Sequence, residues 1–198
     1  MFIGRTRELE FLQECYDSPR AELIVLYGRR RIGKTELLQQ FARDKVAVFY
    51  ACTECTDQEQ LARFSKRILQ TGLPAARFLT VFSDWETALR SIQDVPTEDK
   101  KILIIDEFPY MCASHPELPS ILQNLWDHEL SRANVMLILC GSAMSFIENE
   151  LLAERNPLYG RATGIYKLLP LPFVSVREFF PQYSVEAQVT VYAILGGI

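Results

Sequence analysis

The segment that most constrains this fold is a short apolar run followed by a glycine-framed loop. Residues 22–27, ELIVLY, have the length and composition of a buried β-strand. Residues 28–35, GRRRIGKT, follow directly, and a helical pattern with Leu37, Leu38 and Phe41 on one face comes next. A strand, a glycine loop and a helix in this order predict an anion-binding loop at the carboxyl end of a strand in an α/β sheet.

The residue types in this loop suit a polyphosphate. Gly28 and Gly33 let backbone N–H groups approach the anion, and the helix that follows presents its positive end to it. Lys34 has the reach to contact the β- and γ-phosphates, and the Thr35 hydroxyl is a ligand for Mg²⁺. The expected ATP-binding residues of the loop are Gly28, Arg29, Arg30, Arg31, Ile32, Gly33, Lys34 and Thr35.

Three consecutive arginines occupy variable positions of the loop. Because backbone amides and Lys34 suffice for the phosphates, we expect the side chains of Arg29, Arg30 and Arg31 to point away from the cradle. They would contact nearby acids, a neighbouring subunit or an effector domain. For at least one of them, a simple solvated surface position is the alternative.

Two carboxylates end the apolar strand predicted over residues 101–107, KILIIDE. Ligands of open α/β sheets bind at the carboxyl ends of the strands. We therefore expect Asp106 to hold Mg²⁺, directly or through water, and Glu107 to act as general base on the attacking water. The alternative is a strand that ends in a solvated acidic turn, and the nearby loop favours the catalytic interpretation.

A further apolar strand is predicted over residues 135–142 and ends on Ser142. A polar side chain at this position can contact the γ-phosphate or the attacking water, the role known as sensor 1. The alternative is an ordinary turn serine at the end of a strand.

Apolar runs alternate with helical patterns along the chain. This alternation predicts one three-layer α/β domain, a parallel sheet with helices on both faces. The 198 residues, 48% of them hydrophobic, suffice for one core. Thr6 is the expected N-cap of the first helix. Besides the elements already named, we expect strands at 46–51 and 165–171, and helices at 6–16, 58–71, 84–93, 117–131, 143–154, 175–180 and 185–195.

Composition narrows the class of protein. The formal net charge is −4, so nucleic-acid binding is not indicated for these residues. No apolar run reaches the roughly 18 residues of a membrane span. The first residues, MFIGRTREL, lack the apolar region of a signal peptide. We therefore expect a cytoplasmic protein without membrane contact, whose five cysteines are reduced.

Cys52 and Cys55 form a C-x-x-C pair after the strand predicted at 46–51. Metal or redox chemistry is one interpretation of this spacing. No second pair follows, however, and a structural zinc site uses four ligands. Ordinary reduced thiols are the favoured interpretation.

Six segments resemble the archaeal-type ATPases of the AAA+/STAND assemblage of P-loop NTPases. They occur in that family's order over almost the whole chain and read FIGRTRELEFL, YGRRRIGKTELL, LIIDEFPY, CGSAMSFIENELL, PLYGRATGIYKLLPL and VYAILGGI. The resemblance identifies the loop and the Asp106–Glu107 pair with the Walker A and Walker B motifs. It implies a sheet of five parallel strands in the order 5-1-4-3-2.

The resemblance also implies roles at the two ends of the chain. The segment from Phe2 to Arg5 would pack near the adenine, with Phe2 and Ile3 as contacts. Hydrophobic packing of an N-terminal arm is the alternative for these two residues, and both interpretations can hold. Residues 1–172 would form the ATPase core, and residues 173–198 the start of a helical lid that is cut short.

Arg161 precedes the strand predicted at 165–171. The resemblance implies that it reaches the γ-phosphate of a neighbouring subunit in trans, with Arg155 as a second candidate. The alternatives for Arg161 are a surface position or an ion pair within the chain.

The leading hypothesis for function is Mg²⁺-dependent ATP binding and hydrolysis that drives conformational change in a larger protein. A regulatory nucleotide switch with little turnover is one alternative. A DNA-associated ATPase, with its DNA contacts in a further C-terminal domain, is another. The expected partners are ATP and either a homo-oligomer or an effector domain, and these residues alone would turn over ATP slowly.

Overall fold

Five parallel strands form one sheet in the computed structural model, which describes residues 2–197. The spatial order is β2-β3-β4-β1-β5, which confirms the order 5-1-4-3-2 expected from the sequence. Met1 and Ile198, at the ends of the predicted ranges 1–172 and 173–198, lie outside the described residues. The strands are β1 Glu22–Tyr27, β2 Ala47–Ala51, β3 Lys101–Asp106, β4 Val135–Gly141 and β5 Gly164–Lys167.

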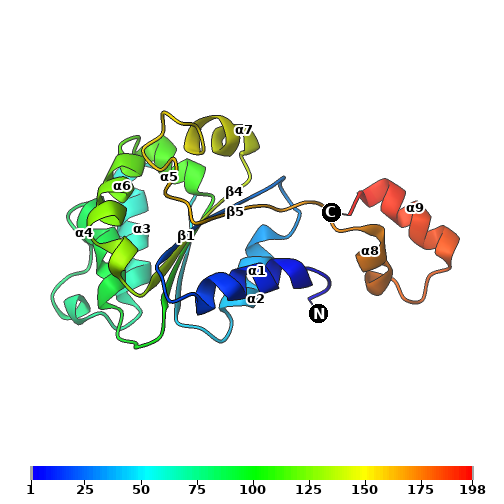
Figure 1. The fold of residues 1–198 in the computed structure, drawn as a ribbon, viewed down its shortest axis with the longest axis horizontal. Helices are drawn as coiled ribbons and strands as arrows, with labels where there is room; N and C mark the ends of the chain where they lie inside the picture. The colour runs from blue at the N-terminus through cyan, green and yellow to red at the C-terminus, as the bar shows by residue number, and fades with distance from the viewer. Residues whose placement is uncertain (1, 198) are drawn as a thin grey trace.

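Helices cover both faces of the sheet and make three layers, as Figure 1 shows. One face carries α1 and α2, and the other carries α3 to α6. The bounds are α1 Thr6–Asp17, α2 Lys34–Ala42, α3 Asp57–Leu69, α4 Trp85–Arg90, α5 Phe108–Ser114 and α6 Leu118–His128.

The three central strands are apolar on both faces because both faces are buried. Ile138 of β4 lies opposite Ile24 on one side and Ile104 on the other, and all three pack towards α1 and α2. The neighbouring residues Leu23 and Leu137 pack towards the opposite helical layer. Continuous apolar runs are the sequence signature of such doubly covered parallel strands.

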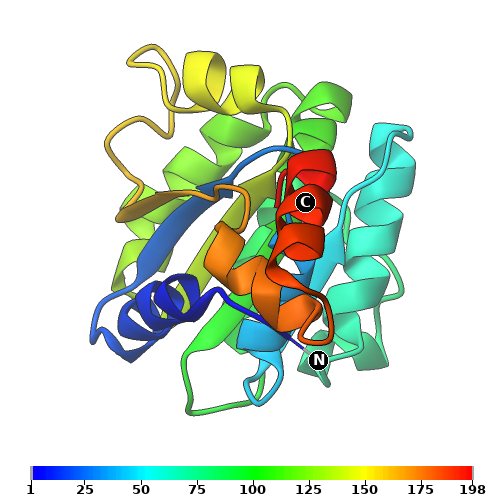
Figure 2. The same cartoon turned by 90° about the vertical axis from the view of Figure 1, so that its right-hand side faces the viewer.

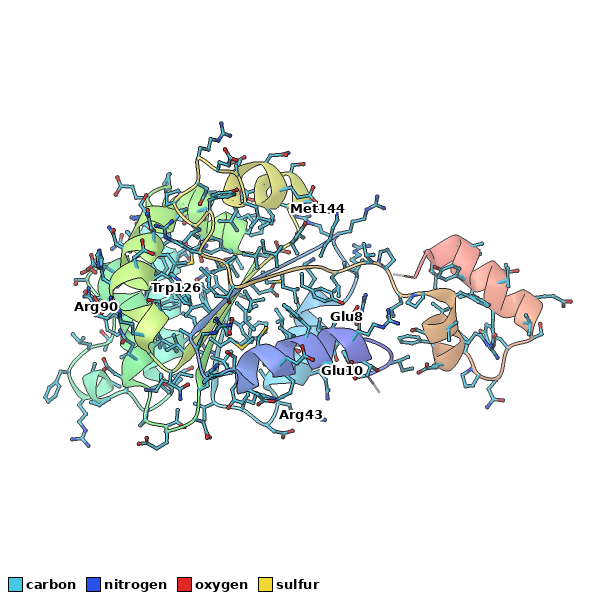
Figure 3. The ribbon with its side chains drawn as sticks, viewed as in Figure 1. Glu8, Glu10, Arg43, Arg90, Trp126 and Met144 are labelled. Atoms are coloured by element: carbon cyan, nitrogen blue, oxygen red, sulfur yellow. The ribbon has the colours of Figure 1, made fainter. Side chains whose placement is uncertain are left out.

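The helices of the layer formed by α3 to α6 are amphipathic. Figure 3 shows Trp126 of α6 on its inner side and Arg90 of α4 on its outer side. Trp126 belongs to the core between the helices and the sheet. Arg90 pairs with Glu86 on its own helix and with Glu129 after α6, so it joins the two helices at the surface.

Most of the remaining elements are short. Three of them are 3₁₀-helices, η1 Pro74–Arg77, η2 Ser91–Asp94 and η3 Leu130–Arg132. After β4, α7 Met144–Phe146 continues into a π-helical turn, η4 Ile147–Leu151. The chain then passes through β5 to α8 Phe173–Phe179 and α9 Val185–Leu195. No helix within residues 2–197 combines the length and apolar character that crossing a membrane requires.

Helices α8 and α9 form a small unit beside the core. Figure 1 shows them projecting from one end of the sheet, and in Figure 2 they lie in front of the sheet. The rings of Phe173 and Tyr192 join them, with centroids 5.5 Å apart. This unit falls within the range 173–198 that the sequence assigns to the start of a lid.

Several predicted boundaries differ from the structure. The strand predicted over 165–171 ends at Lys167, because Pro170 and Pro172 lack the backbone N–H group that donates to a neighbouring strand. Helix α5 was not predicted. Thr6 does not cap α1, since Arg5 is the N-cap residue, with φ of 68° and no side-chain capping bond.

Lys100 fastens the end of α1 to the start of β3. Its side chain is only 6% exposed, and its Nζ donates to the backbone carbonyls of Cys15, Ser18 and Arg20. These carbonyls lie at and just beyond the carboxyl end of the helix, where intrahelical partners run out. Burial lowers the pKa of the Lys100 ammonium, with nearby Glu22 acting in the opposite sense.

We expect Lys100→Met to reduce the free energy of unfolding by about 1–3 kcal/mol, because buried carbonyls would lose their donor. Urea denaturation measures the change. Lys66→Met on the exposed side of α3 is the control, with an expected effect within about 0.5 kcal/mol. Equal losses in the two variants would contradict the structural role of Lys100.

Candidate active site

The glycine loop connects β1 to α2, as the sequence predicts. At Gly28, an added Cβ would lie 2.6 Å from Ile32 Cδ1 and would also collide with the carbonyl oxygen of Leu168, so only glycine fits. Gly33 has φ of 88°, a left-handed conformation that glycine adopts without strain. The loop therefore requires glycine at both framing positions, for two different reasons.

Lys34 lies inside the loop. Its side chain is 5% exposed, and its Nζ donates to the carbonyl oxygens of Gly28 at 3.0 Å and Arg29 at 2.9 Å. The ammonium group is thus held at the centre of the turn. A cleft of about 750 Å³ opens beside it. The lining residues are Arg30, Arg31, Gly33, Lys34, Thr35, Glu36, Gln39, Glu107 and Tyr110.

The two predicted Mg²⁺ ligands are in direct contact. Thr35 Oγ1 donates to Asp106 Oδ2 at 2.6 Å, and Asp106 Oδ1 accepts from the Glu107 N–H at 3.0 Å. Asp106 is only 4% exposed. A hydroxyl and a carboxylate are oxygen ligands of the kind Mg²⁺ prefers, and phosphates and waters complete its shell in such sites. The residues present therefore fit a magnesium ion.

Burial keeps Cys140, next to this pair, uncharged. It raises the pKa of the Cys140 thiol well above its usual range, and the charge of Asp106 adds to the effect. The carboxylate therefore has a neutral neighbour on this side. Asp106 accepts its hydrogen bonds from the Thr35 hydroxyl and from the Glu107 N–H.

Glu107 lies at the end of β3 in a strained conformation. Its φ of 54° is left-handed, which is uncommon for a residue with a Cβ. Its Oε2 accepts a hydrogen bond from the Ser142 backbone N–H at 3.0 Å. The structure therefore brings Glu107 and Ser142 together, through the backbone of Ser142 rather than its hydroxyl.

Arg30 lies along the site instead of pointing away from it. Its Nη2 donates to the hydroxyl of Tyr110 at 2.9 Å. Arg30 borders both the larger cleft and a smaller cavity of about 200 Å³ that Glu107 and Ser142 also line. Arg31 borders the larger cleft, while the carbonyl of Arg29 accepts from Lys34.

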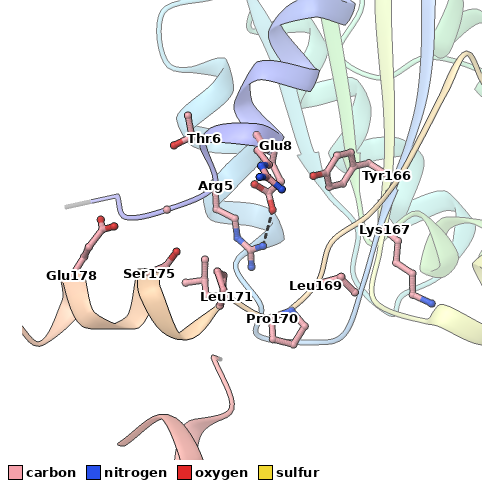
Figure 4. A pocket seen from close by; sticks show the side chains of 13 residues that line it. Arg5, Thr6, Glu8, Tyr166, Lys167, Leu169, Pro170, Leu171, Ser175 and Glu178 are labelled. Atoms are coloured by element: carbon pink, nitrogen blue, oxygen red, sulfur yellow. Dashed lines mark hydrogen bonds and ion pairs between the residues drawn. The ribbon is translucent and has the colours of Figure 1, made fainter. Parts of the chain in front are cut away.

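A third cavity, of about 560 Å³, lies between the N-terminal arm and α8 and is drawn in Figure 4. The arm from Gly4 to Glu8, the exit of β5 and α8 surround it. Arg5 is 8% exposed; it pairs with Glu8 at 2.9 Å and donates to the Ile32 carbonyl at 2.8 Å. The N-terminal arm is therefore bonded to the glycine loop.

Phe2 and Ile3 pack against the body of the protein. Ile3 is buried, and Phe2 is half-buried against the core between the sheet and helices α1 and α2. This is the hydrophobic packing that the sequence left open for both residues.

Arg161 is engaged within its own chain. Its Nε and Nη2 donate to the two carboxylate oxygens of Asp127 on α6, at 2.8 and 2.7 Å, and Nη1 donates to the Pro157 carbonyl. Hydrogen bonding by Arg161 lowers the pKa of the Asp127 carboxyl. This is the intramolecular ion pair that the sequence left open.

The cysteine pair follows β2, and Cys52 packs in the core on the face of the sheet that α3 to α6 cover. Cys52 is buried, and burial raises the pKa of its thiol, with further contributions from Cys112 and Asp106. Cys55 is half-buried. Among residues 2–197, no group of three or more His, Cys, Asp or Glu residues is arranged to hold a metal ion.

Sequence reasoning assigned no role to Tyr110 or to the side chain of Arg5. Tyr110 stands three residues after Glu107, in the first turn of the unpredicted α5. A hydroxyl-bearing residue at that distance from Glu107 was the available signal. The spacing of Arg5 and Glu8 was a local signal for their ion pair, but nothing local indicated the bond to the Ile32 carbonyl, which is 27 residues away.

Comparison with known sequences gives a family. The profile of a family described as an ATPase domain predominantly from Archaea matches residues 2–198. An uncharacterized protein of Methanocaldococcus jannaschii is 35% identical over all 198 residues, and the chain spans 42% of its length. An uncharacterized ATP-binding protein of the same organism is 51% identical over 45 residues, which are 23% of this chain and 76% of that protein.

Solved archaeal proteins share the fold. The Walker-type ATPase of Pyrococcus abyssi matches with a TM-score of 0.76 and 21% identity, over 100% of this chain and 64% of its own. A signal transduction ATPase with numerous domains and a tetratricopeptide repeat sensor, from Pyrococcus horikoshii, matches with a TM-score of 0.64 and 18% identity, over 99% and 28%. The ORC2 protein of Aeropyrum pernix matches with a TM-score of 0.62 and 16% identity, over 90% and 50%.

We expect Arg5→Ala to reduce the free energy of unfolding by about 1–3 kcal/mol, because the Ile32 carbonyl and the Glu8 carboxylate lose their partner. Amide hydrogen exchange in residues 28–33 should become faster as well. Thermal and urea denaturation measure the first effect. Arg7→Ala, an exposed arginine of the same arm, is the control. Unchanged exchange in the loop would show that the arm does not hold it.

Proposed function

The chain belongs to the family of ATPase domains found predominantly in Archaea, and we propose that it binds ATP with Mg²⁺ and hydrolyses it at Glu107. The observation that carries the proposal is the 2.6 Å hydrogen bond between Thr35 and Asp106. It unites the phosphate loop with the acidic end of β3, at the edge of the sheet where ligands of α/β proteins bind.

Each residue of the loop and of the strand ends has a proposed task. Backbone N–H groups of residues 28–33 and the start of α2 would surround the β- and γ-phosphates. Lys34 would exchange its bonds to loop carbonyls for bonds to phosphate oxygens. Thr35 and Asp106 would hold Mg²⁺, which neutralises charge on the β- and γ-phosphate oxygens when it is bound.

Glu107 is the proposed general base. It would take a proton from a water molecule whose oxygen forms a bond to the γ-phosphorus. The bond from that phosphorus to the β–γ bridging oxygen breaks, and its electron pair stays on ADP. Before accepting this proton, Glu107 must turn one oxygen to the water, while the Ser142 N–H holds the other at 3.0 Å. The Ser142 hydroxyl would contact the γ-phosphate or the same water.

The adenine is proposed to occupy the cavity between the N-terminal arm, the exit of β5 and α8. Arg5 supports this placement because it touches both that cavity and the loop carbonyl of Ile32. Phe2 and Ile3 would support the arm from behind by hydrophobic packing.

ATP binding is proposed to alter the position of α8 and α9 relative to the core, residues 1–172. The arm meets α8 closely, since a Cβ on Gly4 would lie 3.1 Å from atoms of Leu171 and Ser175. A nucleotide in the cavity would therefore touch both parts. The conformational change would act on the rest of a larger protein, through an effector domain or a homo-oligomer in which Arg161 leaves Asp127 for a neighbour.

A regulatory switch with little turnover is the second candidate. The bond from the Ser142 N–H to Glu107 Oε2 favours it, because this bond leaves one oxygen for the attacking water, and Glu107 has to turn before it serves as base. The two candidates differ in one measurement, the rate of phosphate release from bound ATP.

We expect Lys34→Ala to weaken ATP binding by about 10–100-fold, because a hydrogen bond to a charged group contributes roughly 1.5–3 kcal/mol. Isothermal titration with ATP and Mg²⁺ measures the affinity. Lys45→Ala is the control, since Lys45 lies beyond the far end of α2. Wild-type affinity in the Lys34 variant would refute its assignment to the phosphates.

We expect Glu107→Gln to retain ATP affinity and to lower turnover by about 10²–10⁴-fold, the range for loss of a general base. Glutamine still accepts from the Ser142 N–H, so the local structure should persist. Glu117→Gln, at an exposed position before α6, is the matched control. Wild-type turnover in the Glu107 variant would exclude it as the base.

A further inference from the structure

We propose that Arg30 contacts the γ-phosphate from within its own chain and stabilises the transition state of hydrolysis, with Tyr110 as its positioning residue. The inference rests on the proposed ATP hydrolysis and adds a catalytic residue to it.

Arg30 occupies the junction between the phosphate loop and the base. It is a member of the loop itself, two residues after Gly28. It lines the cleft that also contains Lys34 and Thr35, and it lines the smaller cavity that contains Glu107 and Ser142. A γ-phosphate held by the loop would lie next to this junction, because the attacking water must reach it from the side of Glu107.

Tyr110 holds the guanidinium at this place. Its hydroxyl accepts from Arg30 Nη2 at 2.9 Å, across 80 residues of sequence. Its backbone N–H donates to the Glu107 carbonyl at 3.0 Å, which fixes it relative to the base. A guanidinium carries several N–H donors in a rigid fork, so one bond to a phenol leaves donors for a phosphate oxygen.

Arg161 and Arg5, two other arginines with a proposed role in the site, are bound to carboxylates. Arg161 makes a bidentate pair with Asp127, and Arg5 pairs with Glu8. Within residues 2–197, Arg30 has no carboxylate within ion-pair distance. Its charge is thus available to an anion without the breaking of an existing pair.

The charge of Arg30 would act mainly during bond exchange. As the water oxygen bonds to the γ-phosphorus and the bond to the bridging oxygen breaks, negative charge lies on the γ-phosphoryl and β-phosphate oxygens. An arginine close to these oxygens stabilises the transition state more than it stabilises bound ATP. Loss of Arg30 should therefore change turnover far more than affinity for ATP.

The experiment compares Arg30→Ala, Arg30→Lys, Tyr110→Phe and Arg161→Ala with the wild type in the full-length protein. Three quantities are measured at several protein concentrations: ATP affinity, turnover, and affinity for ADP with and without aluminium fluoride, a mimic of the transferring phosphoryl group. Arg63→Ala, an exposed arginine of α3, is the control. Circular dichroism verifies that each variant is folded.

We expect Arg30→Ala to lower turnover about 10²–10³-fold, as loss of one transition-state donor does. Its affinity for ATP should stay close to that of the wild type, and aluminium fluoride should no longer tighten ADP binding. Arg30→Lys should restore part of the turnover, since it keeps the charge without the fork. Tyr110→Phe should lower turnover less than Arg30→Ala and leave ATP affinity unchanged.

Unchanged turnover and unchanged fluoride-dependent ADP binding in Arg30→Ala would overturn the role of Arg30 alone. That role would also be excluded if only Arg161→Ala lost both, with a rate that depends on protein concentration. If the wild type binds ATP without turnover, the fluoride-dependent binding of ADP still decides the role of Arg30. A wild type that fails to bind ATP would overturn the proposed function together with this inference.

Discussion

The hydrogen bond from Thr35 to Asp106 joins the two halves of the site, and the sheet order makes it possible. Thr35 follows β1, Asp106 ends β3, and β4 runs between these strands. Because all three are parallel, their carboxyl ends meet at one edge, and groups 71 residues apart come within 2.6 Å. Ser142 follows the intervening strand, so its N–H is in place to hold Glu107.

The architecture was predictable because strands that are buried on both faces appear in the sequence as continuous apolar runs. The runs of β1, β3 and β4 are apolar on both sides along most of their length, with Glu22 and Asp106 as buried exceptions at strand ends. The order of the strands came from the resemblance to a family, not from periodicity. Short elements were predicted less well. Helix α5 was missed, because seven residues are too few for a helical period to stand out, and β5 was predicted too long, since it ends at Lys167.

In the site, local spacing predicted which groups meet, but not how they are held. The contact between Thr35 and Asp106 follows from two strand ends. The contact between Arg30 and Tyr110 depends on the direction of a loop side chain and on an unpredicted helix, so no pattern within either segment encodes it. For Arg30, the expectation of an outward side chain considered only the needs of the phosphates, and it omitted the acceptor that α5 supplies.

The fit of Gly28 against the Leu168 carbonyl has a mechanical consequence. The loop and the chain that leads from β5 to α8 touch there without space for a single added carbon. Close-packed groups resist compression, so a displacement of one backbone must displace the other. A contact of this kind does not depend on charge, and added salt weakens it far less than an exposed ion pair such as that between Arg90 and Glu86. Communication between the loop and α8 by this route should therefore persist at ionic strengths that screen the surface charges.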